Sequence, residues 1–236
     1  MQTADHLDLS QLSCIAFDAD DTLWHNERFF RLTQDRFAEA LAPYAPDTDL
    51  DARLLAAERR NIGHYGYGIK GFVLSMIETA LEVTENRVGG DVIADLIAAG
   101  QDMLQHPIDL LPHATEAVAA ARARGPVLLI TKGDLLDQER KLAQSGLGDL
   151  FDRVEIVSDK NPRVYTRIFD AFGGAARGMM VGNSMKSDVC PMIDAGGIGV
   201  YVPHDLQWDL EAAEAPEGHD RFHTLPDLGA LPDLLA

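Results

Sequence analysis

The feature that most constrains this chain is a short apolar run, residues 14–17, that ends in three carboxylates within four residues. Such a run predicts a buried strand, and in open α/β sheets the reactive groups lie just beyond the carboxyl ends of strands. Asp18 and Asp20 are two residues apart, so a continued strand would direct both side chains to one face. Two carboxylates held that close need a shared proton or a cation. The alternative is an acidic turn that simply ends the strand.

Beyond residue 108 the chain alternates short apolar runs with segments of helical periodicity. This spacing is typical of a parallel sheet covered by helices on both faces. The predicted fold class is therefore α/β with a Rossmann-like parallel sheet, and the Pro- and Asp-rich final segment is expected to wrap the outside. The expected strands are 127–131, 154–157, 179–182 and 198–202, and the expected helices are 114–124, 135–145, 162–172 and 189–195.

An all-helical stretch separates the first strand from this alternating pattern. Apolar residues recur at helical spacing over 27–41, 50–60, 72–81 and 88–104. We therefore expect a discontinuous α/β core domain (1–25 and 108–236) with a helical domain (26–107) inserted after the first strand. Within the insert, residues 61–72 interleave four glycines with aromatic and basic side chains. This pattern suits either a helix–helix connection with packed tyrosines or a loop that faces a substrate.

Charge and composition disfavour several classes of partner. With 38 acidic and 20 basic residues the net charge is −18, and nucleic-acid binding requires Lys and Arg to neutralise phosphates. A small phosphate ester stays compatible, since one metal ion and one lysine reverse the field locally. No apolar run approaches the roughly 18 residues needed to cross a membrane, and neither an export signal nor a CxxC pair is visible. We expect a cytoplasmic protein without a membrane partner, and the oligomeric state is left open.

Polar residues of a consistent kind follow the expected strands. Because the carboxyl ends of parallel strands lie along one edge of a sheet, one crevice can gather these residues. Hard oxygen ligands with positions left for water and phosphate suit Mg²⁺. The set comprises carboxylates, a hydroxyl with adjacent backbone donors, lysines and an amide: Asp18, Asp20, Thr131, Lys132, Gly133, Lys160, Asn183 and Asp188.

Four motifs in this order resemble those of the haloacid dehalogenase-like (HAD) hydrolase superfamily. The first, a strand followed by DxDxT, is residues 17–22, and the second, an apolar strand ending in Ser or Thr, is 128–131. The third, a lysine ahead of a helix, is best matched by Lys160, and the fourth, a GDSxxxxD-like stretch, by 182–188. The resemblance covers nearly the whole chain, and the helical insert is similar to the cap that many of these enzymes carry after the first motif.

The resemblance implies a Mg²⁺-dependent phosphatase that acts on a small phosphorylated metabolite. Asp18 would attack phosphorus to form an aspartyl-phosphate, and Asp20 would serve as general acid and then as general base. Asn183 departs from the motif, which has aspartate there, so one negative charge is lost and weaker metal binding is expected. The implied phosphate-binding groups are Thr131, Lys132, Gly133 and Lys160, and the implied metal ligands are Asp18, Asp20 (through a nearby backbone carbonyl), Asn183 and Asp188.

Several other residues have two interpretations. Lys141 is a second candidate for the motif lysine, but its position inside a helix favours a solvent-exposed face. Trp24 is expected to be structural, and His25 either structural or in contact with a leaving group. His204 and Trp208 are expected to serve packing and surface.

Other functions stay open. A 2-haloacid dehalogenase of the same superfamily uses the same nucleophile but needs no acid for a halide, so Asp20 argues against it. A sugar phosphomutase would keep Asp20 and would need the helical domain to bind both ends of a bisphosphate. From a different class, a non-catalytic phosphate-binding protein is disfavoured because Asp18, Asp20, Thr131 and Lys160 are all present.

Overall fold

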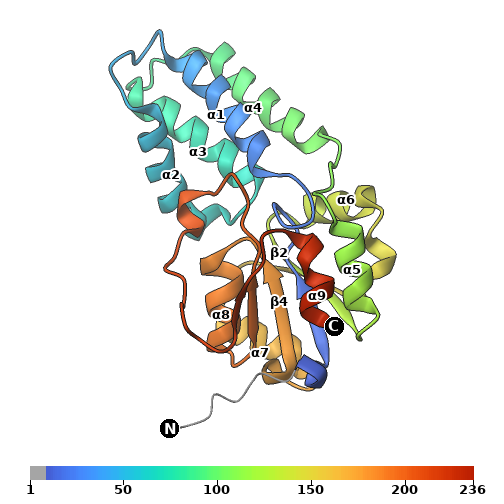
Figure 1. Cartoon of the computed structure of the whole chain (residues 1–236). Helices are drawn as coiled ribbons and strands as arrows, with labels where there is room; N and C mark the ends of the chain where they lie inside the picture. Colours follow the sequence, from blue (N-terminus) through green and yellow to red (C-terminus); the bar gives the residue numbers. More distant parts are fainter. Residues whose placement is uncertain (1–8) are drawn as a thin grey trace. The chain divides into compact units, whose positions relative to one another are not determined.

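The computed structural model describes residues 9–236, which form two compact units (Figure 1). The first unit contains 9–25, Ile108–Thr131 and Arg140–Ala236, and the second contains Asn26–Pro107 and Lys132–Glu139. The domain division expected from the sequence places residues 132–139 in the α/β domain, whereas the structure groups them with the helical residues.

The first unit is built on a six-stranded sheet in the order β3-β2-β1-β4-β5-β6. β1 pairs in parallel with both β2 and β4. β5 pairs in parallel with β4 on one side and with β6 on the other. All of β1 is buried, which explains its uninterrupted apolar sequence. Phe17 at its end aligns with Leu129 of β2 and Val181 of β4, so three carboxyl ends meet at one edge. The strands are β1 (Cys14–Phe17), β2 (Val127–Lys132), β3 (Arg153–Val157), β4 (Gly178–Gly182), β5 (Ile198–Tyr201) and β6 (Phe222–Thr224).

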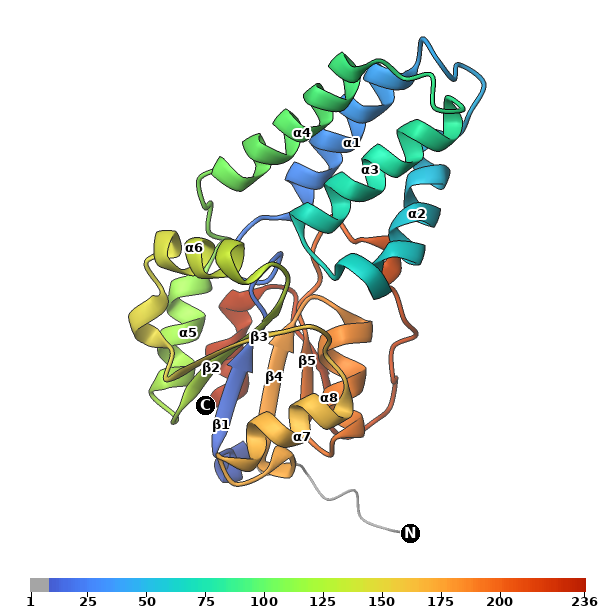
Figure 2. The same ribbon diagram turned by 180° about the vertical axis from the view of Figure 1, so that it is seen from behind.

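Helices cover both faces of the sheet (Figure 2), and the side chains of β1 alternate between the two hydrophobic cores that result. This arrangement confirms the predicted α/β class with a Rossmann-like parallel sheet. One core joins Ile15 and Phe17 to α5 (Ala114–Arg122) and α9 (Leu231–Leu235), and the other joins Cys14 and Ala16 to α7 (Pro162–Asp170) and α8 (Cys190–Asp194).

The C-terminal segment does more than wrap the outside, which corrects the prediction made from its composition. β6 extends the sheet beside β5, and α9 contributes to a core. Leu228, Leu231 and Leu235 are buried, and their spacing marks one face of a helix. β6 is three residues long, too short for an alternating pattern to show in the sequence.

Four helices with facing apolar stripes make up most of the second unit. Phe37 and Met76 are fully buried in the cluster where these stripes meet. α2 begins where the Asp49 carboxylate accepts a hydrogen bond from the Ala52 N–H at 3.0 Å, a favourable N-cap. Of the helices in residues 9–236, none is long and apolar enough to cross a membrane. The four are α1 (Glu27–Leu41), α2 (Leu50–Tyr65), α3 (Ile69–Val83) and α4 (Gly90–Gln105).

The glycine-rich segment contains a much shorter loop than its composition suggests. α2 continues to Tyr65 and α3 begins at Ile69, so three residues connect the two helices. Gly66 and Gly68 have φ angles of +75° and +112°, a backbone conformation that strongly favours glycine. The glycines therefore permit a tight reversal between two helices.

The side chains of this connection contact Lys132–Glu139 within the second unit. The Lys132 ammonium lies 3.8 Å from the centre of the Tyr67 ring, within cation–π range. The Asp134 carboxylate accepts hydrogen bonds from the Lys70 N–H at 3.2 Å and from the Lys70 ammonium at 3.4 Å. These contacts explain why residues 132–139 group with the helices.

Candidate active site

The carboxyl end of β1 lies where the strand order reverses, with β2 on one side and β4 on the other. Open α/β sheets bind ligands in the crevice at such a point. Asp18 is the first residue beyond β1, and its N–H donates to the Val181 carbonyl at 2.9 Å. Its side chain is 10 % exposed, so the sheet holds a nearly buried carboxylate at this edge.

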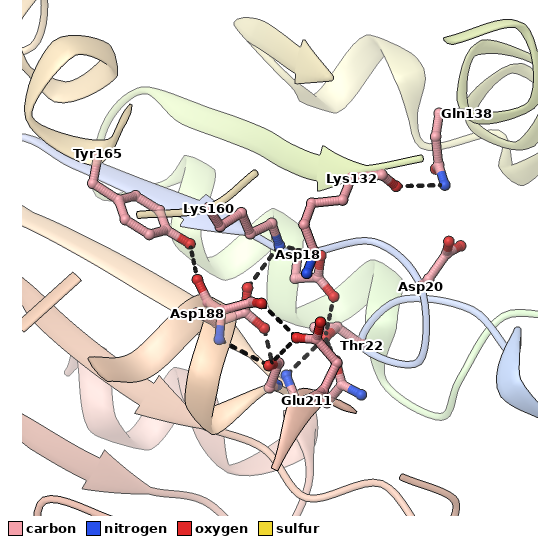
Figure 3. A network of polar contacts seen from close by, with 12 residues as sticks. Asp18, Asp20, Thr22, Lys132, Gln138, Lys160, Tyr165, Asp188 and Glu211 are labelled. Carbon is pink, nitrogen blue, oxygen red and sulfur yellow. Dashed lines mark hydrogen bonds and ion pairs between the residues drawn. The ribbon is translucent and has the colours of Figure 1, made fainter. Parts of the chain in front are cut away.

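Lys160 joins two carboxylates that follow different strands (Figure 3). Its ammonium donates to one oxygen of Asp18 and, at 2.6 Å, to one oxygen of Asp188. The lysine lies two residues before α7, which Asn161 caps by accepting a hydrogen bond from the Val164 N–H at 3.1 Å. Burial acts to lower the pKa of Lys160, but the two carboxylates outweigh it and hold that pKa above its ordinary value. Lys160 is therefore a cation.

Burial raises the pKa of the Asp18 carboxyl to about 7, with Lys160 opposing the rise and Asp188 adding to it. A carboxylate must be ionised to act as a nucleophile. A cation on the Asp18 oxygen that Lys160 does not contact would favour the ionised form.

Asp188 is held by the turn to which it belongs. One of its oxygens contacts Lys160, and the other accepts a hydrogen bond from the Ser184 N–H at 2.9 Å. The turn is π-helical over Met185–Val189 and brings the carboxylate against β4. A Cβ atom on Gly182 would lie 2.2 Å from an Asp188 oxygen. Glycine is therefore required at this position of the fourth motif.

A further carboxylate supports this turn from the C-terminal segment. Glu211 accepts hydrogen bonds from the Ser184 hydroxyl at 2.6 Å and from the Ser187 hydroxyl. The Tyr165 hydroxyl donates to the Ser187 carbonyl at 2.8 Å. Sequence reasoning missed Glu211 because it follows the last expected strand and belongs to no motif.

Oxygen atoms converge on the side-chain amide of Asn183. With the amide oriented by its neighbours, its nitrogen lies 3.2 Å from Asp18 Oδ2, 3.2 Å from Thr22 Oγ1 and 3.3 Å from the Asp20 carbonyl. Thr22 in turn donates to Asp18 Oδ2 at 3.1 Å. The Asp18 carboxylate and the Asp20 carbonyl offer oxygen ligands, which hard divalent cations prefer. Rotation of the Asn183 amide would add its oxygen to this set. The residues present therefore fit Mg²⁺.

Asp20 is held by side chains that the motif does not include. The Lys141 ammonium lies 3.0 and 3.1 Å from its two carboxylate oxygens, and the Trp24 indole N–H donates to it at 2.7 Å. The Lys141 side chain is 7 % exposed, so the expectation of a solvent-exposed face is wrong. The physical reason is that α6 (Leu135–Ser145) buries a polar stripe, which apolar periodicity does not show.

The two motif aspartates therefore have different lysine partners. The prediction that the side chains of Asp18 and Asp20 lie on the same face of the sheet assumes that the strand continues to Asp20. Instead β1 ends at Phe17, and Asp21 adopts a left-handed conformation with φ of +59°. The backbone turns between Phe17 and Asp21, and this turn places Asp20 beside Lys141.

The remaining predicted phosphate-binding residues lie at the end of β2. Thr131 is buried at the same sheet edge as Asp18. Lys132 and Gly133 group with the second unit, where the Gln138 amide donates to the Lys132 carbonyl at 3.1 Å. Gly133 has a φ of +130°, which favours glycine. Contact of these three residues with a phosphate stays a prediction.

A family model for haloacid dehalogenase-like hydrolases matches residues 12–196. The chain therefore belongs to the haloacid dehalogenase-like hydrolase family, which confirms the resemblance of its motifs. None of the curated proteins compared with the sequence matched it.

Solved structures show the same relationship. A haloacid dehalogenase-like family hydrolase from Xanthomonas campestris is 42% identical, with 95% of this chain and 91% of that chain covered and a TM-score of 0.84. A predicted phosphoglycolate phosphatase from Haemophilus somnus is 17% identical, with 96% and 99% covered and a TM-score of 0.65. An L-2-haloacid dehalogenase from Xanthobacter autotrophicus is 18% identical, with 95% and 98% covered and a TM-score of 0.60. The latter two show a shared fold alone.

Proposed function

We propose that this hydrolase is a Mg²⁺-dependent phosphatase that cleaves a small phosphomonoester through an aspartyl-phosphate on Asp18. Phosphatases and dehalogenases share this fold, so the choice depends on the site. The observation that carries the proposal is the fixing of two aspartates by two lysines, Asp18 by Lys160 and Asp20 by Lys141. Displacing an alkoxide from phosphorus needs a nucleophile and a proton donor, whereas a halide leaves without a proton.

The reaction would proceed in two steps. In the first, an Asp18 oxygen bonds to phosphorus, the bond from phosphorus to the leaving oxygen breaks, and Asp20 gives that oxygen a proton. In the second, water attacks phosphorus, Asp20 takes its proton, and the bond to Asp18 breaks to release inorganic phosphate. Lys160, Thr131 and the neighbouring N–H groups would offset charge on the phosphoryl oxygens.

The metal would be held by Asp18, the Asp20 carbonyl and Asn183. Asp188, whose two oxygens already accept hydrogen bonds, would contribute through water. When bound, the ion supplies positive charge that stabilises the phosphoryl oxygens and the ionised carboxylates.

The helical residues 26–107 would act as a cap that selects a small phosphorylated metabolite. The net charge of −18 disfavours nucleic acid as a partner. We further propose a cytoplasmic location without a membrane partner.

The test is hydrolysis of p-nitrophenyl phosphate with Mg²⁺ and with EDTA. We expect turnover with Mg²⁺, none with EDTA, and a kcat about 10²–10⁴-fold lower in Asp20→Asn, which lacks the base that activates water in the second step. Chloride release from 2-chloropropionate serves as the parallel assay. Metal-independent chloride release without phosphate release would identify a dehalogenase and refute the proposal.

Replacing Asn183 with aspartate is expected to tighten Mg²⁺ binding about tenfold, because affinity rises with the charge of the ligands. The same change places a second carboxylate 3.2 Å from Asp18 Oδ2, where the amide nitrogen now lies. The melting temperature of Asn183→Asp should therefore be lower than that of the wild type in EDTA, and adding Mg²⁺ should restore it. Calorimetric titration measures the first effect and thermal denaturation the second. An unchanged Mg²⁺ affinity would remove Asn183 from the ligand set.

Lys141 is expected to position Asp20 for proton transfer. Lys141→Met should lower kcat/KM about 10- to 100-fold on an alkyl phosphate, whose leaving oxygen needs a proton. The loss should be much smaller on p-nitrophenyl phosphate, whose leaving group is a weak base. Lys141→Arg, which keeps the charge, should recover part of the activity. Equal losses on both substrates would show that Lys141 serves folding alone.

A further inference from the structure

Three metal-binding side chains gather beside the aspartate site. A carboxylate oxygen of Asp21 and one ring nitrogen each of His25 and His204 lie within 4.8 Å of one another. Asp21 and His25 belong to the loop after β1, and His204 follows β5, so the first unit supplies all three. The side chains of Asp21 and His204 are each 9 % exposed. From the sequence, His204 is expected only to pack against other residues or to lie at the surface, and its proximity to Asp21 and His25 is not predicted.

The orientation of His204 is typical of metal-binding histidines. Its Nδ1 lies 2.9 Å from the Leu206 carbonyl oxygen and 3.2 Å from the Leu206 nitrogen. In one tautomer Nδ1 accepts a hydrogen bond from the Leu206 N–H. In the other tautomer Nδ1 carries the proton and donates it to the Leu206 carbonyl oxygen, which leaves Nε2 with the lone pair that a metal requires. Nε2 is the nitrogen nearest the Asp21 carboxylate.

The separation of these two atoms suits a shared ion better than a direct bond. Nε2 of His204 lies 3.6 Å from Asp21 Oδ1, beyond hydrogen-bond distance. Two ligands of a tetrahedral ion with bonds of about 2.1 Å are roughly 3.4 Å apart. The His25 ring lies edge-on to that of His204, with ring centres 5.6 Å apart, and would supply the third ligand.

Backbone hydrogen bonds already fix the loop that carries two of these ligands. The Asp21 N–H donates to the Trp24 carbonyl at 2.7 Å, and the His25 N–H donates to the Asp109 carbonyl at 3.0 Å. A metal ion would therefore bind to a loop that needs little ordering, which lowers the free-energy cost of binding.

We propose that Asp21, His25 and His204 form a second cation site that takes Zn²⁺ or a similar divalent transition metal. Imidazole nitrogens favour such ions over Mg²⁺, which prefers oxygen. Three protein ligands leave a fourth position for water. The bound ion would tie the loop that carries Asp20 to the segment after β5. This site does not depend on the proposed phosphatase activity.

The test is Zn²⁺ binding by the full chain after chelator treatment and dialysis. By isothermal titration calorimetry we expect one Zn²⁺ equivalent at this site, with affinity at least about tenfold weaker in His204→Gln and in His25→Gln. Co²⁺ in place of Zn²⁺ should give the visible absorption of a tetrahedral ion, and this absorption should be lost in both variants. Far-ultraviolet circular dichroism in EDTA checks that both variants are folded.

Two controls separate this site from other binding. His64→Gln, an exposed histidine in α2, should bind Zn²⁺ like the wild type. Asp18→Asn should keep the Zn²⁺ equivalent although it removes a carboxylate ligand from the proposed Mg²⁺ site. Folded His25→Gln and His204→Gln proteins that bind Zn²⁺ as tightly as the wild type would overturn the proposal. Loss of the equivalent in Asp18→Asn would overturn it as well, by placing the ion at the aspartates. Because the readout is binding, the result stands whether or not the chain is a phosphatase.

Discussion

Asp18→Asn is expected to reduce turnover of p-nitrophenyl phosphate by at least about 10⁴-fold, because an amide cannot form the bond to phosphorus. Stability should change little, since the Asn oxygen can still accept the hydrogen bond that Lys160 donates to Asp18. The measurement is kcat with saturating Mg²⁺, with melting temperatures recorded in parallel.

The matched control for Asp18→Asn is Asp159→Asn, a carboxylate that follows β3 and is exposed. It should retain the activity of the wild type. An Asp18→Asn protein that is folded and within tenfold of wild-type activity would exclude Asp18 as the nucleophile.

Lys160→Met is expected to lower the free energy of unfolding by about 3–5 kcal/mol, because removing one partner leaves buried charge uncompensated. Here two carboxylates, those of Asp18 and Asp188, would lose their shared cation, and both are nearly inaccessible. Activity should be lost as well. Urea denaturation measures the stability, and adding Asp188→Asn to Lys160→Met should recover part of it by removing one of the two charges.

Lys70→Met is the control for Lys160→Met, since Lys70 forms an exposed ion pair with Asp134 at 3.4 Å. Exposed pairs contribute at most about 1 kcal/mol. If the two lysine variants had similar stability, the buried network around Lys160 would not hold the strand ends together as described.

Much of the fold could be predicted because the sequence obeys the periodicities of its elements. β1 through β5 and the helices that follow them appear as apolar runs and stripes, so their order specifies a parallel sheet. α1 occupies Glu27–Leu41, the range its apolar residues predict. β6 and α9 could not be recognised in the same way. One is three residues long, and the other is a five-residue helix in a segment rich in Pro and Asp.

The candidate site could be predicted only where strand topology brings residues together. Asp18, Lys160 and Asp188 follow three different strands, and the structure brings them into one network. Lys141 and Asp20 are 121 residues apart and meet because α6 turns a polar stripe inward. Periodicity shows which side of a helix is apolar, but it does not show what a buried lysine faces. Glu211 was missed for a different reason, since it follows the last expected strand and belongs to no motif.

The most direct test of the central claim is capture of the covalent intermediate. The enzyme is mixed with a phosphomonoester and Mg²⁺, quenched in acid within a single turnover, digested and analysed by mass spectrometry. Our account predicts one phosphoryl group on Asp18 in the wild type and none in Asp18→Asn. Turnover without any phosphorylated aspartate, or with the phosphoryl group on another residue, would contradict it.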